Sequence, residues 1–229
     1  MKILCTLLLA TAVTAHAKTW NFSDSNALSD WSAIGKTQQE SGGIKLGPSA
    51  GDFAISGLRL LDPAKLSNRS LSLKCKISDV SVENTAEEEL ENGNDIRINI
   101  VLNSIPTANW ESDKAVVNVT LFYNSENHAF WVGLFGKGDG AQRQETIPIS
   151  SGTFLGDGSG NGEIEVSVTL DEKKIHAIFS RGGVPIKELD AEVPAHIRSL
   201  LSDNIYLLIV QQNIGKGTGS ILLNSVELN

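Results

Sequence analysis

The sequence predicts an all-β protein, a two-sheet antiparallel β-sandwich of the jelly-roll type. Nearly every segment that contains apolar residues alternates with a period of two rather than 3.6, which is the strand signal. Short turn sequences, such as NSEN at 124 and RGG at 181, separate pairs of these segments at hairpin spacing. No helix-length segment stands regularly between the strands, as a parallel sheet with helical crossovers would require.

The first 17 residues, MKILCTLLLATAVTAHA, have the features of a secretory signal peptide. Lys2 precedes an apolar stretch over 3–13, and Ala15-His16-Ala17 places small residues where signal peptidase cleaves. The stretch is shorter than the roughly 20 apolar residues of a membrane-spanning helix. We therefore expect 1–17 to be removed and 18–229 to form a single β-sandwich domain, secreted or periplasmic, in a chain of bacterial type.

The composition of the expected mature chain excludes some partners. The whole chain has 19 basic and 27 acidic residues, and cleavage removes only Lys2, so the mature net charge is 18 minus 27, or −9. An acidic surface repels phosphate backbones and anionic lipids. We therefore expect neither nucleic acid nor an anionic membrane as a partner. No membrane span is expected either, because no later segment is long and apolar enough. Cys75 is the one cysteine left after cleavage, so no intramolecular disulfide is expected and Cys75 is predicted to be a small buried hydrophobe.

The strands can be placed in order from the alternation. EIEVSVTL, at 163–170, places Ile, Val and Leu on one face and acids or hydroxyls on the other, and HAFWVGLF, at 128–135, is apolar on both faces. DPAKL at 62 and PAHIRSLL at 194–201 are predicted as short helical bridges. The predicted strands are 19–22, 44–46, 52–58, 70–80, 95–102, 114–123, 128–135, 144–149, 162–170, 174–181, 184–190, 204–212 and 220–228.

The first and last of these strands are expected to lie side by side. An unpaired strand at the edge of a sheet exposes backbone groups to other chains, so proteins usually cover it. TWNF at 19–22 is the natural partner for ILLNSVEL at 221–228. The sequence therefore predicts that the N- and C-terminal strands are adjacent.

Three segments resemble those of a known class of domain. WNFSDSNALSDWSAIG, from Trp20, resembles the opening of secreted carbohydrate-binding sandwiches, and GSILLNSVELN resembles their closing strand. The hairpins from Gly162 to Pro194 are similar to those of concanavalin-A-like lectin/glucanase domains, the class that includes laminin-G-like modules. The resemblance covers most of 18–229 and implies a jelly roll that binds carbohydrate.

The resemblance also raises two possibilities that the residues support poorly. Glucanases of this class carry three acids on one strand, whereas here Glu163 and Glu165 lack a third and are expected on a solvated face. Related modules bind calcium near their termini, where Asp24 could serve but Asn224 replaces the usual Asp. Whether the protein is an enzyme stays open, with a non-catalytic role favoured. Three Asn-x-Ser/Thr sequons, at Asn21, Asn68 and Asn118, are interpreted as incidental.

One further segment has the pattern of half a calcium loop. GDGSGNGE, at 156–163, places oxygen ligands at Asp157, Ser159 and Asn161 before Gly162. The twelfth position, where a calcium loop needs a Glu, is Val168. A weak calcium site and an ordinary glycine-rich connection are both compatible with this pattern.

Trp110 is the aromatic residue that best fits a sugar platform. It is flanked by Asn109 and Glu111 in a loop between two strands, and a pyranose can stack on a ring while polar neighbours bind its hydroxyls. We predict a ligand site of Trp110, Asn109, Glu111 and Tyr123, with polysaccharide or glycan as the ligand. The alternative for Trp110 is that it covers the end of the sandwich. Trp20, Trp31 and Trp131 are expected in the core.

The sequence thus favours a secreted, non-catalytic carbohydrate-binding β-sandwich. Two alternatives stay open: a cell-surface or matrix module that binds other proteins, and a glycan hydrolase or lyase of the same fold.

Overall fold

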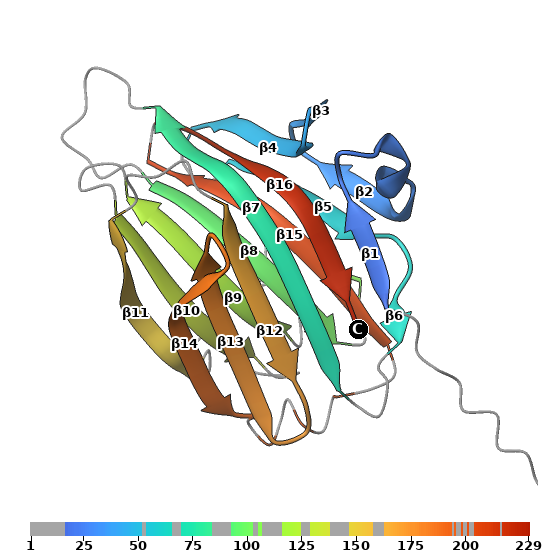
Figure 1. The fold of residues 1–229 in the computed structure, drawn as a ribbon, viewed down its shortest axis with the longest axis vertical. Coiled ribbons are helices and arrows are strands. Elements are labelled where there is room, and N and C mark those ends of the chain that lie inside the picture. Colours follow the sequence, from blue (N-terminus) through green and yellow to red (C-terminus); the bar gives the residue numbers. More distant parts are fainter. Residues whose placement is uncertain are drawn as a thin grey trace, which may run out of the picture.

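Two antiparallel β-sheets stacked face to face make up most of the protein (Figure 1). This is a computed structural model, in which one face of each sheet turns towards the other sheet and the second face turns away from it; we call the latter the outer face. The structure describes residues 17–51, 54–65, 70–83, 93–102, 105–106, 116–124, 129–137, 147–157, 163–193, 195, 198, 201, 204–215 and 217–229.

The terminal sheet contains both terminal strands. Its eight strands are, in order, β14 (Val184–Glu192), β13 (Lys174–Arg181), β12 (Ile164–Leu170), β7 (Leu71–Glu83), β16 (Thr218–Leu228), β4 (Gly43–Ala50) and β3 (Thr37–Glu40), with β1 (Lys18–Asn21) also paired to β16. β7 covers one edge of β16, while β4 and β1 share the other: β4 pairs with Thr218–Leu223 and β1 with Ser225–Leu228. The predicted adjacency of the first and last strands is confirmed.

The second sheet packs against the terminal sheet. Its eight strands are, in order, β11 (Ile147–Asp157), β10 (Ala129–Lys137), β9 (Val116–Asn124), β8 (Gly93–Leu102), β15 (Asn204–Ile214), β5 (Ile55–Leu60) and β2 (Trp31–Ile34), with β6 (Ala64–Lys65) also paired to β15. A short 3₁₀ helix, η1 (Ser25–Asp30), leads from β1 into β2, and Asp24 caps its N-terminus. The predicted jelly-roll sandwich is confirmed.

The core lies between the sheets and follows the alternation in the sequence. On β8, Ile96, Ile98 and Ile100 are buried in it, and Ile164, Val166 and Val168 of β12 are buried in it from the other sheet. Trp20 and Trp31 pack edge to face with ring centroids 5.1 Å apart. Cys75 is fully buried, as predicted, and burial raises the pKa of its thiol.

The prediction of a helical bridge at 62–66 is wrong at Ala64 and Lys65. These two residues form β6 and pair with Ile205 and Asn204. The short DPAKL stretch has no apolar face to bury as a helix, so pairing with an open part of β15 decides its conformation. In the other predicted bridge, Ala195 and Arg198 are helical. Within the described ranges, no helix is both long enough and apolar enough to cross a membrane.

The pairing of β16 with each of its neighbours is interrupted by a bulge, with β4 between Gly219 and Ile221 and with β7 between Ser220 and Leu222. Asp79 and Val80 of β7 stand opposite Ile221 alone, and Gly47 and Pro48 of β4 stand opposite Ser220 alone. A bulge bends the strand and displaces its side chains from the regular pleat. Two bulges at neighbouring positions therefore displace side chains of β4 and β7 on either side of β16.

Candidate functional site

Polar residues alternate with the core residues of β8 and lie on the outer face of the second sheet. Asp95, Arg97 and Asn99 stand between the core isoleucines. They are not a solvated surface, because Asn99 is 0% exposed, Asp95 6% exposed and the Arg97 side chain 18% exposed. We call these three residues, with Asn118 and Thr120 of β9, the polar row.

Hydrogen bonds link three residues of the polar row in a chain that begins with the Thr120 donor and ends at Asn99. Asn118 stands opposite Asn99, and Thr120 opposite Arg97, in the register of β8 and β9. The Thr120 hydroxyl donates to Oδ1 of Asn118, and Nδ2 of Asn118 donates to Oδ1 of Asn99. Among the described residues, Nδ2 of Asn99 has no hydrogen-bond partner. The chain of bonds therefore ends on an unused buried donor.

The charged pair of the polar row leaves an unused acceptor. Nε of Arg97 donates to Oδ2 of Asp95 at 2.7 Å, and Nη2 of Arg97 binds the same oxygen. Burial raises the pKa of Asp95, and the neighbouring Arg97 guanidinium opposes that shift. Oδ1 of Asp95 has no partner within the described part of the chain. A buried polar atom without a partner costs about 1 to 3 kcal/mol, so both ends of the row favour a ligand that supplies one.

Apolar and aromatic side chains flank the polar row on the same face. Val101 and Val116 continue β8 and β9 beyond the row, and Leu208 and Val210 lie beside it on β15. All four are buried but lie outside the core cluster between the sheets. Phe122, partly exposed, lies on the same face of β9, whereas the side chain of Trp131, which was expected in the core, lies outside the described part of the structure. The face therefore combines hydrogen-bonding groups with apolar walls.

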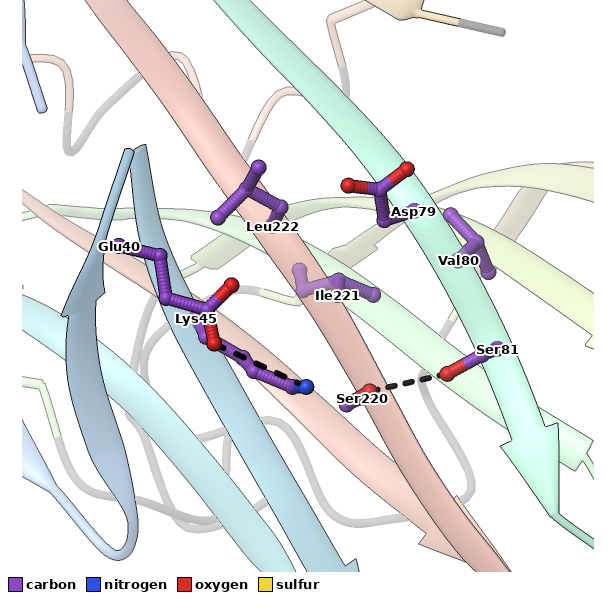
Figure 2. Close-up of a pocket in the computed structure, with 8 residues that line it drawn as sticks. All are labelled: Glu40, Lys45, Asp79, Val80, Ser81, Ser220, Ile221 and Leu222. Carbon is purple, nitrogen blue, oxygen red and sulfur yellow. Dashed lines mark hydrogen bonds and ion pairs between the residues drawn. The ribbon is translucent and has the colours of Figure 1, made fainter. Parts of the chain in front are cut away.

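A separate hollow of about 260 Å³ lies on the outer face of the terminal sheet, where β16 is bulged (Figure 2). It is lined by Glu40, Lys45, Asp79, Val80, Ser81, Ser220, Ile221 and Leu222. Nζ of Lys45 lies 3.8 Å from Oε1 of Glu40, and the hydroxyls of Ser81 and Ser220 are 2.9 Å apart. Figure 2 shows both contacts in the hollow, which places groups from β3, β4, β7 and β16 together.

The predicted ligand residues fall mostly in the connection between β8 and β9. Trp110, Asn109 and Glu111 lie outside the described residues, and the prediction for them stays a prediction. Tyr123 is on β9, 8% exposed and part of the core cluster, and burial raises the pKa of its hydroxyl. Its side chain thus lies on the opposite face of β9 from Thr120.

The predicted calcium ligands are described only at Asp157, where the backbone ends β11; Ser159 and Asn161 lie outside the described residues. No group of three His, Cys, Asp or Glu side chains that could hold a metal occurs in the described ranges. Glu163 and Glu165 are on the solvated face, as predicted, with Oε1 of Glu163 3.1 Å from Nζ of Lys76 and Oε1 of Glu165 3.5 Å from Nζ of Lys74.

Reasoning from the sequence missed the polar row and the hollow. The predicted strand 95–102 includes DIRINI, and its polar positions carried a usable signal: an ion pair and an amide opposite the VNVT of the next strand. The Asn118 sequon lies in this row at 1% exposure, so it is buried in the folded protein. No signal along the chain indicates the hollow, because it depends on how β4 and β7 pair with β16.

Comparison with known proteins supports the fold only. No protein-family profile matches the chain, and no characterised protein sequence matches it. In fold it is similar to the CBM2 module of the evolved Dit of Lactobacillus casei BL23 phage J-1 (TM-score 0.67, 9% identity, covering 92% of this chain and 93% of that one). It is also similar to the Ca²⁺/Man3GlcNAc-bound exoplasmic/lumenal domain of VIP36 (TM-score 0.63, 10% identity, covering 93% of this chain and 90% of that one).

A legume lectin-like domain from Entamoeba histolytica is a third structural neighbour (TM-score 0.61, 14% identity, covering 90% of this chain and 92% of that one). With its two stacked sheets and paired terminal strands, the protein has the concanavalin-A-like lectin fold. At these identities the likeness extends to the fold and no further.

Proposed function

We propose that the protein is a secreted, non-catalytic carbohydrate-binding β-sandwich whose site is the outer face of the second sheet. The observation that carries this proposal is the polar row, a buried set of hydrogen-bonding groups with an unused donor at Asn99 and an unused acceptor at Asp95. Sugar hydroxyls both donate and accept, so one ligand satisfies both ends. The lectin-like fold of the structural neighbours supports the same ligand class.

The spacing of the polar row suits a chain of sugars. Asp95 and Asn99 are four residues apart on β8, which corresponds to about 13 Å along a strand. That length exceeds one pyranose ring, so an oligosaccharide fits better than a single sugar. Phe122, which is partly exposed beside the row, would offer its ring to the carbon face of a sugar.

Trp110 is included in this proposal because it lies in the connection between β8 and β9. The connection leaves β8 at Leu102 and enters β9 at Val116, the two strands that hold the polar row. We propose that Trp110 stacks on a sugar at this end of the row, with Asn109 and Glu111 binding its hydroxyls. Tyr123 is not included, because its side chain lies in the core.

The polar row favours binding over hydrolysis. Glycoside hydrolysis uses two carboxylates in most enzymes, one as acid and one as nucleophile or base. β8, β9 and β15 together contain one carboxylate, Asp95, and Glu111 of the connection is the other carboxylate proposed for this site. Because Asp95 is already paired with Arg97, the two do not make a free acid and nucleophile. This composition supports a non-catalytic role.

The glycan array is the direct test of this function. We expect the 18–229 chain to bind a restricted set of glycans and Trp110→Ala to lose that binding. Asn99→Asp keeps the acceptor for Asn118 and removes the unused donor, so it should weaken binding at least tenfold. Glu188→Gln, on the exposed surface of β14, is the control and should bind normally. An empty array, or full binding by both site variants, would refute the proposal.

The calcium site predicted at Asp157, Ser159 and Asn161 is retained as part of the proposal. VIP36 and Emp46p domains, which share the fold, are known in Ca²⁺-bound and potassium-bound forms respectively. If calcium shapes the glycan site, EDTA should abolish array binding and added Ca²⁺ should restore it. Binding that is unaffected by EDTA would remove calcium from the function.

Protein binding is the second candidate, and one observation favours it. Val184 and Ile186 are 66% and 42% exposed on β14, which ends the terminal sheet. Open strand edges with apolar side chains are places where other chains add. A sedimentation experiment on Val184→Lys/Ile186→Lys should show no change if this edge is unused, and loss of a complex if it is an interface.

A further inference from the structure

We propose that the hollow over β16 is a second saccharide site, which binds one sugar ring on the side of the sandwich opposite the polar row. The inference rests on the proposed function for the ligand class, whereas the site itself is argued from the geometry of the hollow. The hollow lies on the outer face of the terminal sheet, and the polar row lies on the outer face of the second sheet, so the core separates them.

Specific contacts fix the backbone around the hollow. Where the bulges interrupt the pairing of β7 with β16, Nδ2 of Asn94 reaches from the second sheet and donates to the carbonyl oxygens of Ser81 at 3.1 Å and Ser220 at 2.9 Å. Asn94 is 0% exposed, so these bonds are made inside the protein. On the β4 side, a Cβ on Gly47 would lie 2.5 Å from the carbonyl oxygen of Gly219, so only glycine fits.

Asp79 at the rim has an unusual backbone conformation. Its φ of 49° is the one positive value among the described residues other than glycine. Residues in this region store backbone strain of about 1 to 3 kcal/mol, and such strain is found mostly at functional sites. Asp79 has no ion pair with any described residue, and its carboxylate stands beside Leu222 and Val80 (Figure 2). The bulge therefore presents an unpaired acceptor at the hollow.

The lining matches the chemistry of a sugar ring. Asp79 and Glu40 accept hydrogen bonds from hydroxyls, the Lys45 ammonium donates, and the serine hydroxyls do both. Leu222 supplies an aliphatic surface for the C–H groups of the ring, whereas the side chain of Val80 packs against the core. Charges of both signs face the hollow, which disfavours a strongly ionic ligand of either sign. A volume of 260 Å³ is below the roughly 300 to 1,000 Å³ of pockets for larger ligands, so one ring fits.

Two sites on opposite sides of one sandwich would allow a single molecule to bridge two glycan chains. Each site alone is expected to be weak, and simultaneous binding to a multivalent surface would raise the overall affinity. The hollow thus extends the proposed function from binding to cross-linking.

The test is an NMR titration of ¹⁵N-labelled 18–229 chain with methyl α-mannopyranoside, methyl β-glucopyranoside and methyl β-galactopyranoside. We expect at least one of them to shift the backbone amides of Val80, Ser81 and Leu222. Asp79→Asn should raise the Kd obtained from these shifts at least tenfold, because Asn tolerates the left-handed backbone but carries no charge. Glu188→Gln should titrate as the parent does, and unchanged spectra elsewhere will show that Asp79→Asn is folded.

The two proposals fail separately in this experiment. Shifts at the hollow support the second site whether or not the amides of Arg97, Asn118 and Thr120 move. Shifts confined to those three amides overturn the second site and leave the polar row standing. No shift at Val80, Ser81 or Leu222 with any of the three glycosides, or a hollow response that survives Asp79→Asn unchanged, overturns the inference.

Discussion

The side-chain amide nitrogen of Asn94, on β8, lies 2.9 Å from the backbone carbonyl oxygen of Ser220, on β16 of the other sheet. Asn94→Asp would replace the donor with a second carboxylate oxygen, facing carbonyl oxygens in a fully buried place. We expect a loss of about 3 to 5 kcal/mol in the free energy of unfolding. For a domain of this size that corresponds to a melting temperature roughly 6 to 20 °C lower.

Asn224→Asp is the matched control for that measurement. Nδ2 of Asn224 also donates to a backbone carbonyl, that of Gly42 at 3.0 Å, but at an exposed position. Water can replace this bond, so the same substitution should cost about 1 kcal/mol or less. Equal losses in the two variants would mean that the bond between the sheets has no special importance.

Removal of β16 should prevent folding. A fragment of residues 18–219 lacks Ile221, Leu223, Val226 and Leu228, all of which belong to the core cluster. At about 1.5 to 3 kcal/mol each, their loss equals most of the 5 to 15 kcal/mol that stabilises a typical domain. β7, β4 and β1 would also lose their common partner. Circular dichroism and solubility check this, and a soluble fragment with cooperative melting would contradict it.

Cys75 should not react with redox or thiol reagents while the protein is folded. It is fully buried, and burial raises the pKa of its thiol, so the reactive thiolate is not formed. The 18–229 chain should melt at one temperature with or without dithiothreitol, and Ellman's reagent should label it only in denaturant. Rapid labelling of the native protein would show that the strand around Cys75 opens.

Asp30 should make the terminal strand sensitive to acid. Its carboxylate accepts from Nε1 of Trp20 at 2.7 Å and lies 2.9 Å from Nζ of Lys18. Hydrogen bonds from Lys18 and then Trp20 lower the pKa of Asp30. A lowered pKa in the folded state means that the contribution is complete above the unfolded pKa of about 3.9 and is lost as the pH falls through the folded value.

The corresponding variant is Asp30→Asn. It should lower stability by about 1 kcal/mol or less at neutral pH, because the Asp30 side chain is 39% exposed and solvent screens the pair. The difference from the parent should shrink below about pH 4. Urea unfolding at several pH values measures it, and a difference that grows on acidification would contradict the assigned cause.

Most of the fold follows from alternation, which is local information. The predicted strand at 174–181 matches β13 at both ends, and the period-two pattern of 163–170 matches β12. β2 and β3 were missed because WSAI and TQQE are only four residues long and TQQE has no apolar alternation. Their strand conformation depends on pairing with β5 and β4, which is decided by tertiary structure.

The candidate sites were less predictable for a related reason. Alternation in the sequence separates the residues of a strand into two faces, but it does not show whether the second face is exposed to solvent. Asp95 and Glu165 both alternate with core residues and lie on the outer faces of their strands. Asp95 is nevertheless only 6% exposed in the polar row, whereas Glu165 pairs with surface lysines. The bulge at Asp79 depends on the pairing of residues about 140 positions apart, such as Ser81 and Ser220.

The position of β16 in the chain also determines when the terminal sheet can form. β1, β4 and β7 all precede it, and pairs such as Leu73 with Leu228 join residues separated by 228 minus 73, or 155, positions. During synthesis these three strands leave the ribosome long before their shared partner, so the edges of β1, β4 and β7 that pair with β16 stay open until translation has passed residue 228. Contacts of such long range make folding slow, and until they form the open edges of these strands can pair with other molecules.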